Sequence, residues 1–182
     1  MAKPTYIIAE IASAHEGSIE LLNKIYNLAT QSGANAVKIQ IFHRESLMSR
    51  FHHKYDSFGE IEISKKNWKD FLKNLNKSNT DLLVEVFDPV SLDIAEKSTK
   101  VDGYKIPSSC LGDHEFIKLV ARTFKPIYLG VGGATLEEIT DALNCIRECN
   151  NDYCTLMHGI QSFPTKLEDS QISLISSICC SV

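Results

Sequence analysis

One short stretch of the sequence combines a cation with hydroxyl groups at the end of a predicted strand. Residues 104–106 are apolar except for Lys105, and Pro107 ends the run, as is typical of a short buried strand. Burying a lysine is costly unless an anion neutralises it. Ser108 and Ser109 follow, where a parallel strand opens onto the functional edge of its sheet. Two interpretations stay open from this stretch alone: a phosphate or carboxylate site, or a lysine that extends to solvent from an edge strand.

Other predicted strands also carry a polar residue at or near the carboxyl end. Apolar runs bounded by turn residues predict six strands, at residues 6–11, 36–42, 82–87, 104–106, 126–129 and 154–158. The polar residues concerned are Glu10, Lys38, Glu85, Lys105 and His158. One such residue is usually a solvated strand tip, but a set of them at the same edge of a sheet fits the active-site end of an α/β barrel. For His158 taken alone, a packed histidine at a strand end is the expectation.

Helix signals lie between the predicted strands. Residue types that cap helix N-termini stand just ahead of amphipathic runs, at Ser18, Ser64, Asp88, Asp113 and Thr135. Glu138 follows the last of these at the spacing of a capping box, and a final short helix is expected at about residues 170–178. The polar stretch 43–63 is long for a connection, and loops of this length are often lids or binding loops. His52 and His53 within it are expected to be solvated.

About six strand-then-helix units with short links predict an α/β fold in which parallel strands have helices outside them. A TIM barrel has about eight such units and about 250 residues. The 182 residues therefore predict either an open, doubly wound sheet or an incomplete TIM-barrel-type fold with about six of eight units. We expect residues 1–182 to form a single partial-barrel domain, whose exposed sheet edges favour association or aggregation.

The composition argues against several classes of protein. A net charge of -4 and a pI near 5.9 argue against a nucleic-acid surface. No apolar segment approaches the roughly 20 residues of a membrane helix, and the amino terminus does not resemble a signal peptide. Cys145, Cys149 and Cys154 lack paired Cys-x-x-Cys spacing, so they are expected to be buried apolar side chains and not metal ligands. A reduced, cytoplasmic protein without nucleic-acid or membrane partners is expected.

Several separate motifs resemble those of the N-acetylneuraminate (sialic acid) synthase family, in the right order and over essentially the whole chain. They are Ile8-Ala9-Glu10-Ile11 with His15 and Gly17, residues 36–40, Tyr104-Lys105-Ile106 with Ser108, residues 134–139, and His158 with Phe163-Pro164-Thr165. The resemblance implies a TIM barrel that is usually followed by a small antifreeze-like domain, which reaches over a partner's active site in a homodimer. That second domain is predicted to be absent from residues 1–182.

The resemblance also implies an activity. Members of this family condense phosphoenolpyruvate with the open-chain aldehyde of an N-acyl amino sugar, which yields a nonulosonic acid and phosphate. By this likeness Lys38 and Lys105 bind phosphoenolpyruvate, with Ser108 at its phosphate. Glu10 is implied near the sugar or the reacting centre, and Cys110 stands where the family commonly has a glutamate thought to move protons; these two are the catalytic candidates. Further candidates for substrate binding are Gln40, Glu85 and Gln161.

The departures from the family pattern cluster at the expected site. Residues 14–17 are Ala-His-Glu-Gly where Asn-His-Asn-Gly is usual, and residues 84–87 are Val-Glu-Val-Phe in place of Ser-Thr-Pro-Phe. Residues 130–133 are Gly-Val-Gly-Gly in place of Ser-Thr-Gly-Met, which removes a phosphate-binding hydroxyl. Gln161 and Phe163 stand where Asn and Tyr are common. These changes predict a divergent member that acts on a sugar other than the precursor of sialic acid.

The metal chemistry of the family is expected to lie outside this chain. The resemblance implies a divalent cation, Mn or Mg, whose histidine ligands belong to a seventh strand and a later motif. We therefore predict no metal ligand within residues 1–182 and no product from this chain alone. A truncated or degenerate barrel that binds a ligand or a partner without turnover is the alternative. Another phosphoenolpyruvate aldol synthase, of the ketodeoxyoctonate-phosphate type, is less favoured because residues 135–139 and 163–165 resemble the sialic acid synthases.

Overall fold

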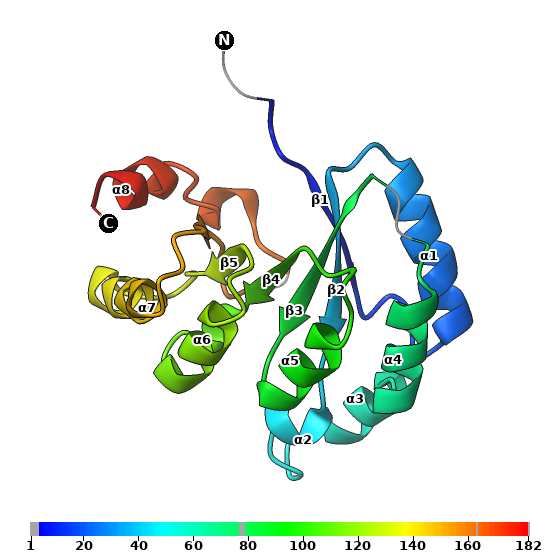
Figure 1. Cartoon of the computed structure of the whole chain (residues 1–182). Coiled ribbons are helices and arrows are strands. Elements are labelled where there is room, and N and C mark those ends of the chain that lie inside the picture. The colour runs from blue at the N-terminus through cyan, green and yellow to red at the C-terminus, as the bar shows by residue number, and fades with distance from the viewer. Residues whose placement is uncertain (1–3, 77–78, 163, 182) are drawn as a thin grey trace. The chain divides into compact units, whose positions relative to one another are not determined.

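The computed structural model describes residues 4–76, 79–162 and 164–181 (Figure 1). The chain forms two compact units, Met1–Gly103 and Tyr104–Val182, and the boundary falls within the strand Gly103–Ile106. Strands and helices alternate along both units, which confirms the predicted α/β class. The prediction of a single domain stays a prediction.

The first unit holds three parallel strands in the order of the chain, β1 (Ile8–Ala12), β2 (Ala36–Ile41) and β3 (Asp81–Val86). In their register Glu10 lies opposite Lys38, and Gln40 lies opposite Glu85. The pairing of β1 with β2 shifts between Glu10 and Ala12, where the backbone turns to a φ of 48° at Ala12. The register therefore brings four polar side chains to neighbouring positions on three strands.

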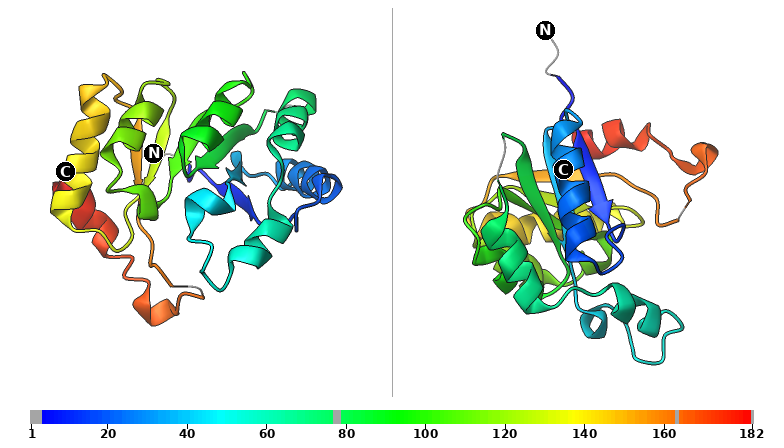
Figure 2. Two further views of the ribbon diagram at one scale, coloured as in Figure 1. Left: turned by 90° about the horizontal axis from the view of Figure 1, so that it is seen from below. Right: turned by 90° about the vertical axis from the view of Figure 1, so that its right-hand side faces the viewer.

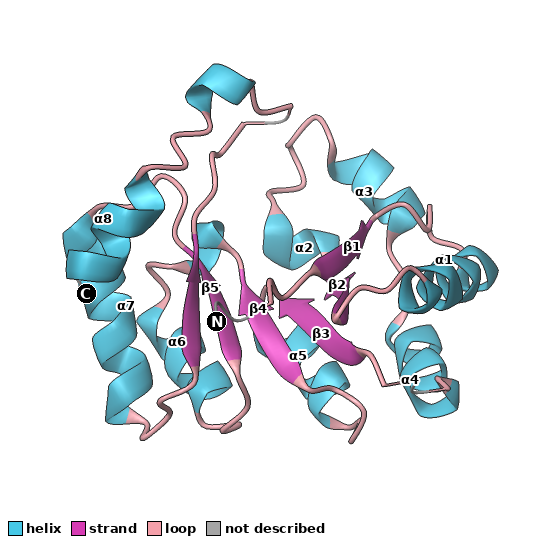
Figure 3. Cartoon of the chain, turned by 90° about the horizontal axis from the view of Figure 1, so that it is seen from above, coloured by secondary structure: helices cyan, strands magenta, loops and turns pink. Residues whose placement is uncertain are grey.

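Three helices pack beside these strands, α1 (Ile19–Gln31), α4 (Lys65–Asn74) and α5 (Pro89–Glu96) (Figure 3). Helix α1 contacts β1 and β2, α5 contacts β3, and α4 contacts α1 and α5. Aromatic rings join the first two helices: Phe71 meets Tyr26 and Trp68 edge-on, with ring centroids 6.1 Å and 5.9 Å apart. Edge-to-face pairs of this kind add to the stability that burial of the rings supplies.

The predicted helix starts are confirmed. At each one the side chain of the predicted residue accepts a hydrogen bond from the backbone N–H three residues later, as the structure shows for Ser18, Ser64, Asp88, Asp113 and Thr135. The predicted capping box is complete, since Oε2 of Glu138 accepts from the backbone N–H of Thr135 at 2.7 Å. Asp88 forms a second capping box with Ser91, which the sequence analysis did not foresee.

The stretch 43–63 is more ordered than its polar composition suggests. It contains two short helices, α2 (Arg44–Leu47) and α3 (Tyr55–Ile61), and extends past the ends of the strands of its own unit (Figure 2). Phe42 stacks edge-on against Phe58, with ring centroids 5.7 Å apart. Gly17, with a φ of 77°, approaches α3 so closely that a Cβ there would lie 2.6 Å from the carbonyl oxygen of Glu60. These contacts hold the segment against the loop before α1.

The second unit holds β4 (Gly103–Ile106) apart from its first residue, β5 (Ile127–Gly130) and β6 (Cys154–Met157), which also pair in parallel and in chain order. Helices α6 (His114–Ala121) and α7 (Leu136–Glu148) contact each other. The last helix, α8 (Leu174–Ser181), begins later than predicted, and a 3-10 turn at Leu167–Asp169 precedes it. Asn151 is buried and donates to the carbonyl oxygens of Ala121 and Lys125, which ties the end of α6 to the start of β5.

Cysteines at four described positions are free thiols, at Cys110, Cys145, Cys149 and Cys154. Burial raises the pKa of the Cys154 thiol to about 11, so this side chain stays protonated and acts as an apolar filler. Within residues 4–76, 79–162 and 164–181, no helix is both long enough and apolar enough to cross a membrane.

Candidate functional site

Lys38 lies between two carboxylates. Its Nζ donates to Oε2 of Glu85 at 2.6 Å and forms an ion pair with Oε2 of Glu10. Nε2 of Gln40 donates to the same oxygen of Glu85 at 3.0 Å. We call these four residues of β1, β2 and β3 the carboxylate–lysine cluster. One ammonium and two carboxylates give the ionised cluster a formal charge of −1.

The cluster is buried unevenly. The side chains of Lys38 and Glu85 are 9% and 6% exposed, whereas that of Glu10 is 38% exposed. Burial by itself lowers the pKa of Lys38, but the carboxylates of Glu85 and Glu10 outweigh burial and leave that pKa above its ordinary value. Lys38 is therefore a permanent cation at neutral pH, and Glu10 is the most exposed charged member of the cluster.

Backbone irregularity fixes the position of Glu10. Where β1 departs from regular pairing, Oε1 of Glu10 accepts a hydrogen bond from the backbone N–H of Ala12 at 2.9 Å. Irregularities of this kind re-aim side chains and are common next to active sites. Glu10 uses one oxygen for the backbone and the other for Lys38, so its carboxylate has a defined orientation despite its exposure.

In the second unit Ser108 sits against the turn that follows β5. Its Oγ accepts a hydrogen bond from the backbone N–H of Gly132 at 3.1 Å. Gly130 is packed so tightly here that a Cβ on it would lie 2.9 Å from both the backbone nitrogen and Oγ of Ser108. A pocket of about 310 Å³ opens beside this contact, and its lining includes Ser108, Gly132, Glu138 and Asp141.

The remaining predicted site residues of the second unit have distinct settings. Lys105 is half-buried on β4, opposite Tyr128. Cys110 ends the 3-10 turn Ser108–Cys110 and is half-buried. Gln161 is exposed, and its Nε2 donates to the carbonyl oxygen of Gly132 at 3.2 Å. Ser108 and Gln161 thus contact the same residue, Gly132, whereas Phe163 lies outside the described residues.

Two histidines, His158 and His15, make contacts that hold the fold together. His158 is half-buried, and its Nε2 lies 2.9 Å from the carbonyl oxygen of Ser170, where it acts as the donor. This agrees with the expectation of a packed histidine at a strand end. His15 is only 1% exposed; its Nδ1 accepts from the backbone N–H of Gly17 at 3.0 Å, and its ring meets Trp68 edge-on at 6.1 Å. Burial lowers the pKa of His15, so the folded protein keeps this ring neutral.

The buried His15 predicts a pH dependence of stability. Because the pKa of His15 is lower in the folded than in the unfolded chain, the unfolded chain binds more protons below about pH 6.5. The stability that the neutral His15 side chain contributes is therefore complete above about pH 6.5. It is lost as the pH falls toward the lowered pKa that His15 has in the folded chain. Urea unfolding between pH 8 and pH 5 is expected to show a steeper loss of stability for the wild type than for His15→Gln. His53→Gln, at an exposed position, should keep the wild-type slope; equal slopes for His15→Gln and His53→Gln would contradict the prediction.

The sequence analysis missed a histidine–carboxylate contact. Nδ1 of His43 lies 2.8 Å from Oε1 of Glu62, and the other oxygen of Glu62 accepts from the backbone N–H of Arg44 at 3.2 Å. The guanidinium of Arg44 lies over the ring of Tyr55, 4.5 Å from its centroid. Glu62 therefore joins the two ends of the segment that contains α2 and α3. No local pattern of the sequence signals this, because the partners are nearly twenty residues apart.

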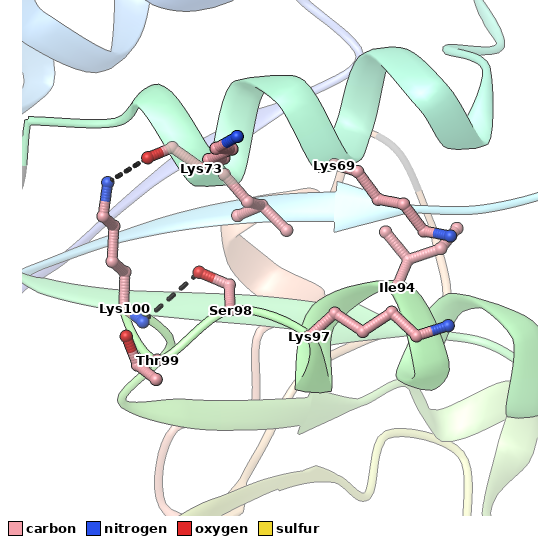
Figure 4. Close-up of a pocket in the computed structure, with 8 residues that line it drawn as sticks. Lys69, Lys73, Ile94, Lys97, Ser98, Thr99 and Lys100 are labelled. Carbon is pink, nitrogen blue, oxygen red and sulfur yellow. Dashed lines mark hydrogen bonds between the residues drawn. The ribbon is translucent and has the colours of Figure 1, made fainter.

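Lysines line another pocket, of about 340 Å³, between α4 and the end of α5 (Figure 4). Two of these lysines are already engaged. Nζ of Lys100 donates to the carbonyl oxygens of Lys73 and Leu75 at 2.6 Å and 2.5 Å, and Lys97 pairs with Asp93 at 2.5 Å. Lys100 thus satisfies carbonyl groups at the end of α4, where a cation is favourable. Because Lys97 and Lys100 have these structural partners, we do not take this pocket as the candidate site.

A metal centre does not fit the described residues. Among residues 4–76, 79–162 and 164–181 there is no group of three or more His, Cys, Asp or Glu side chains that could hold a metal ion. The two carboxylates of the carboxylate–lysine cluster are occupied by an ammonium group. We therefore derive no step of a reaction through a metal bound to these residues.

Over the described residues, six strands that pair in parallel within each unit alternate with helices, which is an α/β fold of the TIM-barrel type. The structure matches that of the N-acetylneuraminic acid (sialic acid) synthetase from Leptospira borgpetersenii serovar Hardjo-bovis, crystallised with citrate, with a TM-score of 0.90 and 23% sequence identity. The match covers 99% of this chain and 62% of the other. At this level of identity the likeness establishes the fold alone.

The chain belongs to the NeuB family, whose model matches residues 25–180. It is 28% identical over 193 residues to the N,N'-diacetyllegionaminic acid synthase of Campylobacter jejuni, covering 97% of this chain and 57% of that protein. It is 30% identical over 188 residues to the pseudaminic acid synthase of Helicobacter pylori, and this match covers 94% of this chain and 54% of that protein. These matches confirm the predicted family. The chain spans about half the length of these curated relatives.

Proposed function

We propose that the chain is part of a synthase in carbohydrate biosynthesis that condenses phosphoenolpyruvate with an N-acyl amino sugar aldehyde, which yields a nonulosonic acid and phosphate. Membership of the NeuB family and the names of the two relatives support this proposal. The observation that carries it is the buried, permanently charged Lys38 beside Glu10 on neighbouring strands. A fixed cation next to a partly exposed carboxylate suits an anionic substrate whose reaction also moves protons.

In the proposed reaction the enol carbon of phosphoenolpyruvate forms a bond to the aldehyde carbon, and the aldehyde oxygen takes up a proton. The phosphate-bearing carbon becomes cationic, water adds there and loses a proton, and cleavage of the C–O bond releases phosphate. We assign Lys38 to binding of phosphoenolpyruvate, and we assign Lys105 and Ser108 to the same substrate on the sequence resemblance alone. Glu10 and Cys110 are proposed to act at the sugar or the reacting centre, and Gln40 and Gln161 to contact substrate.

Two further parts of the proposal concern the longer protein. The divalent cation that the resemblance implies would orient the aldehyde, and its ligands would come from residues other than those described here. A homodimer, in which a second domain reaches over a partner's site, is proposed on the same ground.

The test is thermal unfolding of the chain with and without phosphoenolpyruvate, because only a ligand of the native state raises the unfolding temperature. We expect the transition to move upward with ligand, and Lys105→Ala to weaken that shift more than Lys66→Ala, which changes an exposed lysine of α4. Equal shifts for the two variants, or no shift for the wild type and for Lys66→Ala, would contradict the assignment.

A non-catalytic protein that binds a ligand or a partner is the second candidate. It is favoured by the neutralisation of Lys38 by two carboxylates, which weakens its attraction for an anionic substrate. Phosphate release separates the two candidates. We expect no release by this chain alone from phosphoenolpyruvate and N-acetylmannosamine with manganese; release at a rate that depends on the metal would show that the chain is itself an enzyme.

A further inference from the structure

We propose that Glu85 competes with anionic ligands for Lys38 and thereby weakens their binding at this lysine, free phosphate included. The identity of the substrate rests on the proposed function. The competition itself rests on the geometry of the first unit, so the two can be tested apart.

The geometry places a carboxylate where a bound anion would otherwise sit. Oε2 of Glu85 accepts from Nζ of Lys38 at 2.6 Å and from Nε2 of Gln40 at 3.0 Å. Two donors that converge on one oxygen, one of them charged, are the usual setting for an oxygen of a phosphate or a carboxylate ligand. Here the protein supplies that oxygen itself. An incoming anion must share Lys38 with Glu85 or displace it.

Charge and burial make this competition strong. The Glu85 side chain is 6% exposed, so water screens its charge poorly. Glu10 occupies a second direction of approach to the same ammonium. With both carboxylates ionised the cluster is negative by one charge, and an anion at this position meets net repulsion. Lys38 therefore serves as an anion site only when another interaction offsets that repulsion.

The competing charge belongs to this sequence. A neutral side chain at this position would leave Lys38 paired with Glu10 alone, and the charges of that pair cancel. The expected consequence of Glu85 is that a small free anion such as phosphate binds poorly, while a ligand with further contacts is retained. Such a site favours the release of phosphate as a product.

The experiment compares ligand affinity of the wild type with that of Glu85→Gln by isothermal titration, using phosphoenolpyruvate and inorganic phosphate as separate probes. Glutamine keeps the size of the side chain and an oxygen that accepts from Lys38, but removes the charge. We expect Glu85→Gln to bind both probes at least about tenfold more tightly than the wild type, because one buried charge is removed. Glu20→Gln, an exposed charge change in the same unit, should leave both affinities unchanged.

The outcomes separate the inference from the proposed function. Unchanged affinity in Glu85→Gln for both probes would overturn the inference, and so would failure of this variant to bind either probe. If Glu85→Gln binds phosphate more tightly than the wild type does, but neither protein binds phosphoenolpyruvate more tightly than phosphate, the competition is supported and the proposed substrate is contradicted. Glu85→Thr is the second variant in case glutamine impairs folding, which a cooperative urea transition would reveal, and the same gain is expected for it.

Discussion

Replacing Lys38 with methionine is expected to lower the free energy of unfolding by about 3–5 kcal/mol, because removal of one partner of a buried ion pair leaves the other charge uncompensated. The charge left behind is that of Glu85, whose side chain is 6% exposed. Methionine fills much of the volume of the lysine stem, so the loss of charge dominates over the loss of packing. Urea unfolding of the wild type and of Lys38→Met at pH 7 measures the difference.

A surface pair gives the matched control for this prediction. Lys97 pairs with Asp93 at 2.5 Å, but both side chains are more than half exposed. Lys97→Met is therefore expected to cost no more than about 0.5 kcal/mol, as is usual for exposed pairs four residues apart on a helix. Equal costs for the two methionine variants would show that the carboxylate–lysine cluster is solvated and would contradict the argument from burial.

The double variant Lys38→Met/Glu85→Gln tests the cause of the loss. If the cost comes from the buried charge of Glu85 after the loss of its ammonium partner, removal of that charge should restore part of the stability, and the double variant should be more stable than Lys38→Met alone. The coupling energy in this cycle is expected to exceed about 1 kcal/mol, which contacting residues commonly reach. Additive effects would assign the cost to packing of the methionine.

The fold could be predicted from the sequence because its signals are local. Capping residues such as Ser18 and Thr135 define helix starts through bonds to backbone groups three residues away, and short apolar runs define strands. The ends of helices were predicted less accurately: the last helix begins at Leu174, several residues later than expected. Helices α2 and α3 were missed, because contacts such as Phe42 with Phe58 and His43 with Glu62 stabilise a segment whose own composition is polar.

The candidate site could be predicted as a set of residues but not as a network. Parallel strands bring their carboxyl ends to one edge, so the proximity of Glu10, Lys38 and Glu85 follows from the fold class. The partners of each charge depend on register and on side-chain reach. Lys38 was expected to bind a substrate, whereas the structure shows its ammonium held by two carboxylates. The binding of a substrate by Lys38 stays a prediction, and Glu85 is the residue that we expect to weaken this binding.

Replacing Gly130 with serine is expected to lower the free energy of unfolding by about 1–3 kcal/mol, the usual cost of an overpacked position. In this protein a Cβ at residue 130 would lie 2.9 Å from the backbone nitrogen of Ser108 and 3.3 Å from the carbonyl oxygen of Ile106. Backbone atoms cannot turn aside as a flexible side chain does, so the segment that carries Ser108 must shift.

Gly112→Ser is the matched control, because a Cβ at Gly112 would meet no heavy atom within 4 Å. It should change the free energy of unfolding by no more than about 0.5 kcal/mol. Hydrogen exchange gives a local measurement: the amide of Gly132 donates to Oγ of Ser108, so its exchange should become faster in Gly130→Ser and stay unchanged in Gly112→Ser. Gly130 and the Ser108 turn therefore fit each other, and a side chain at residue 130 is expected to displace that turn. Full stability and unchanged exchange in Gly130→Ser would contradict this conclusion.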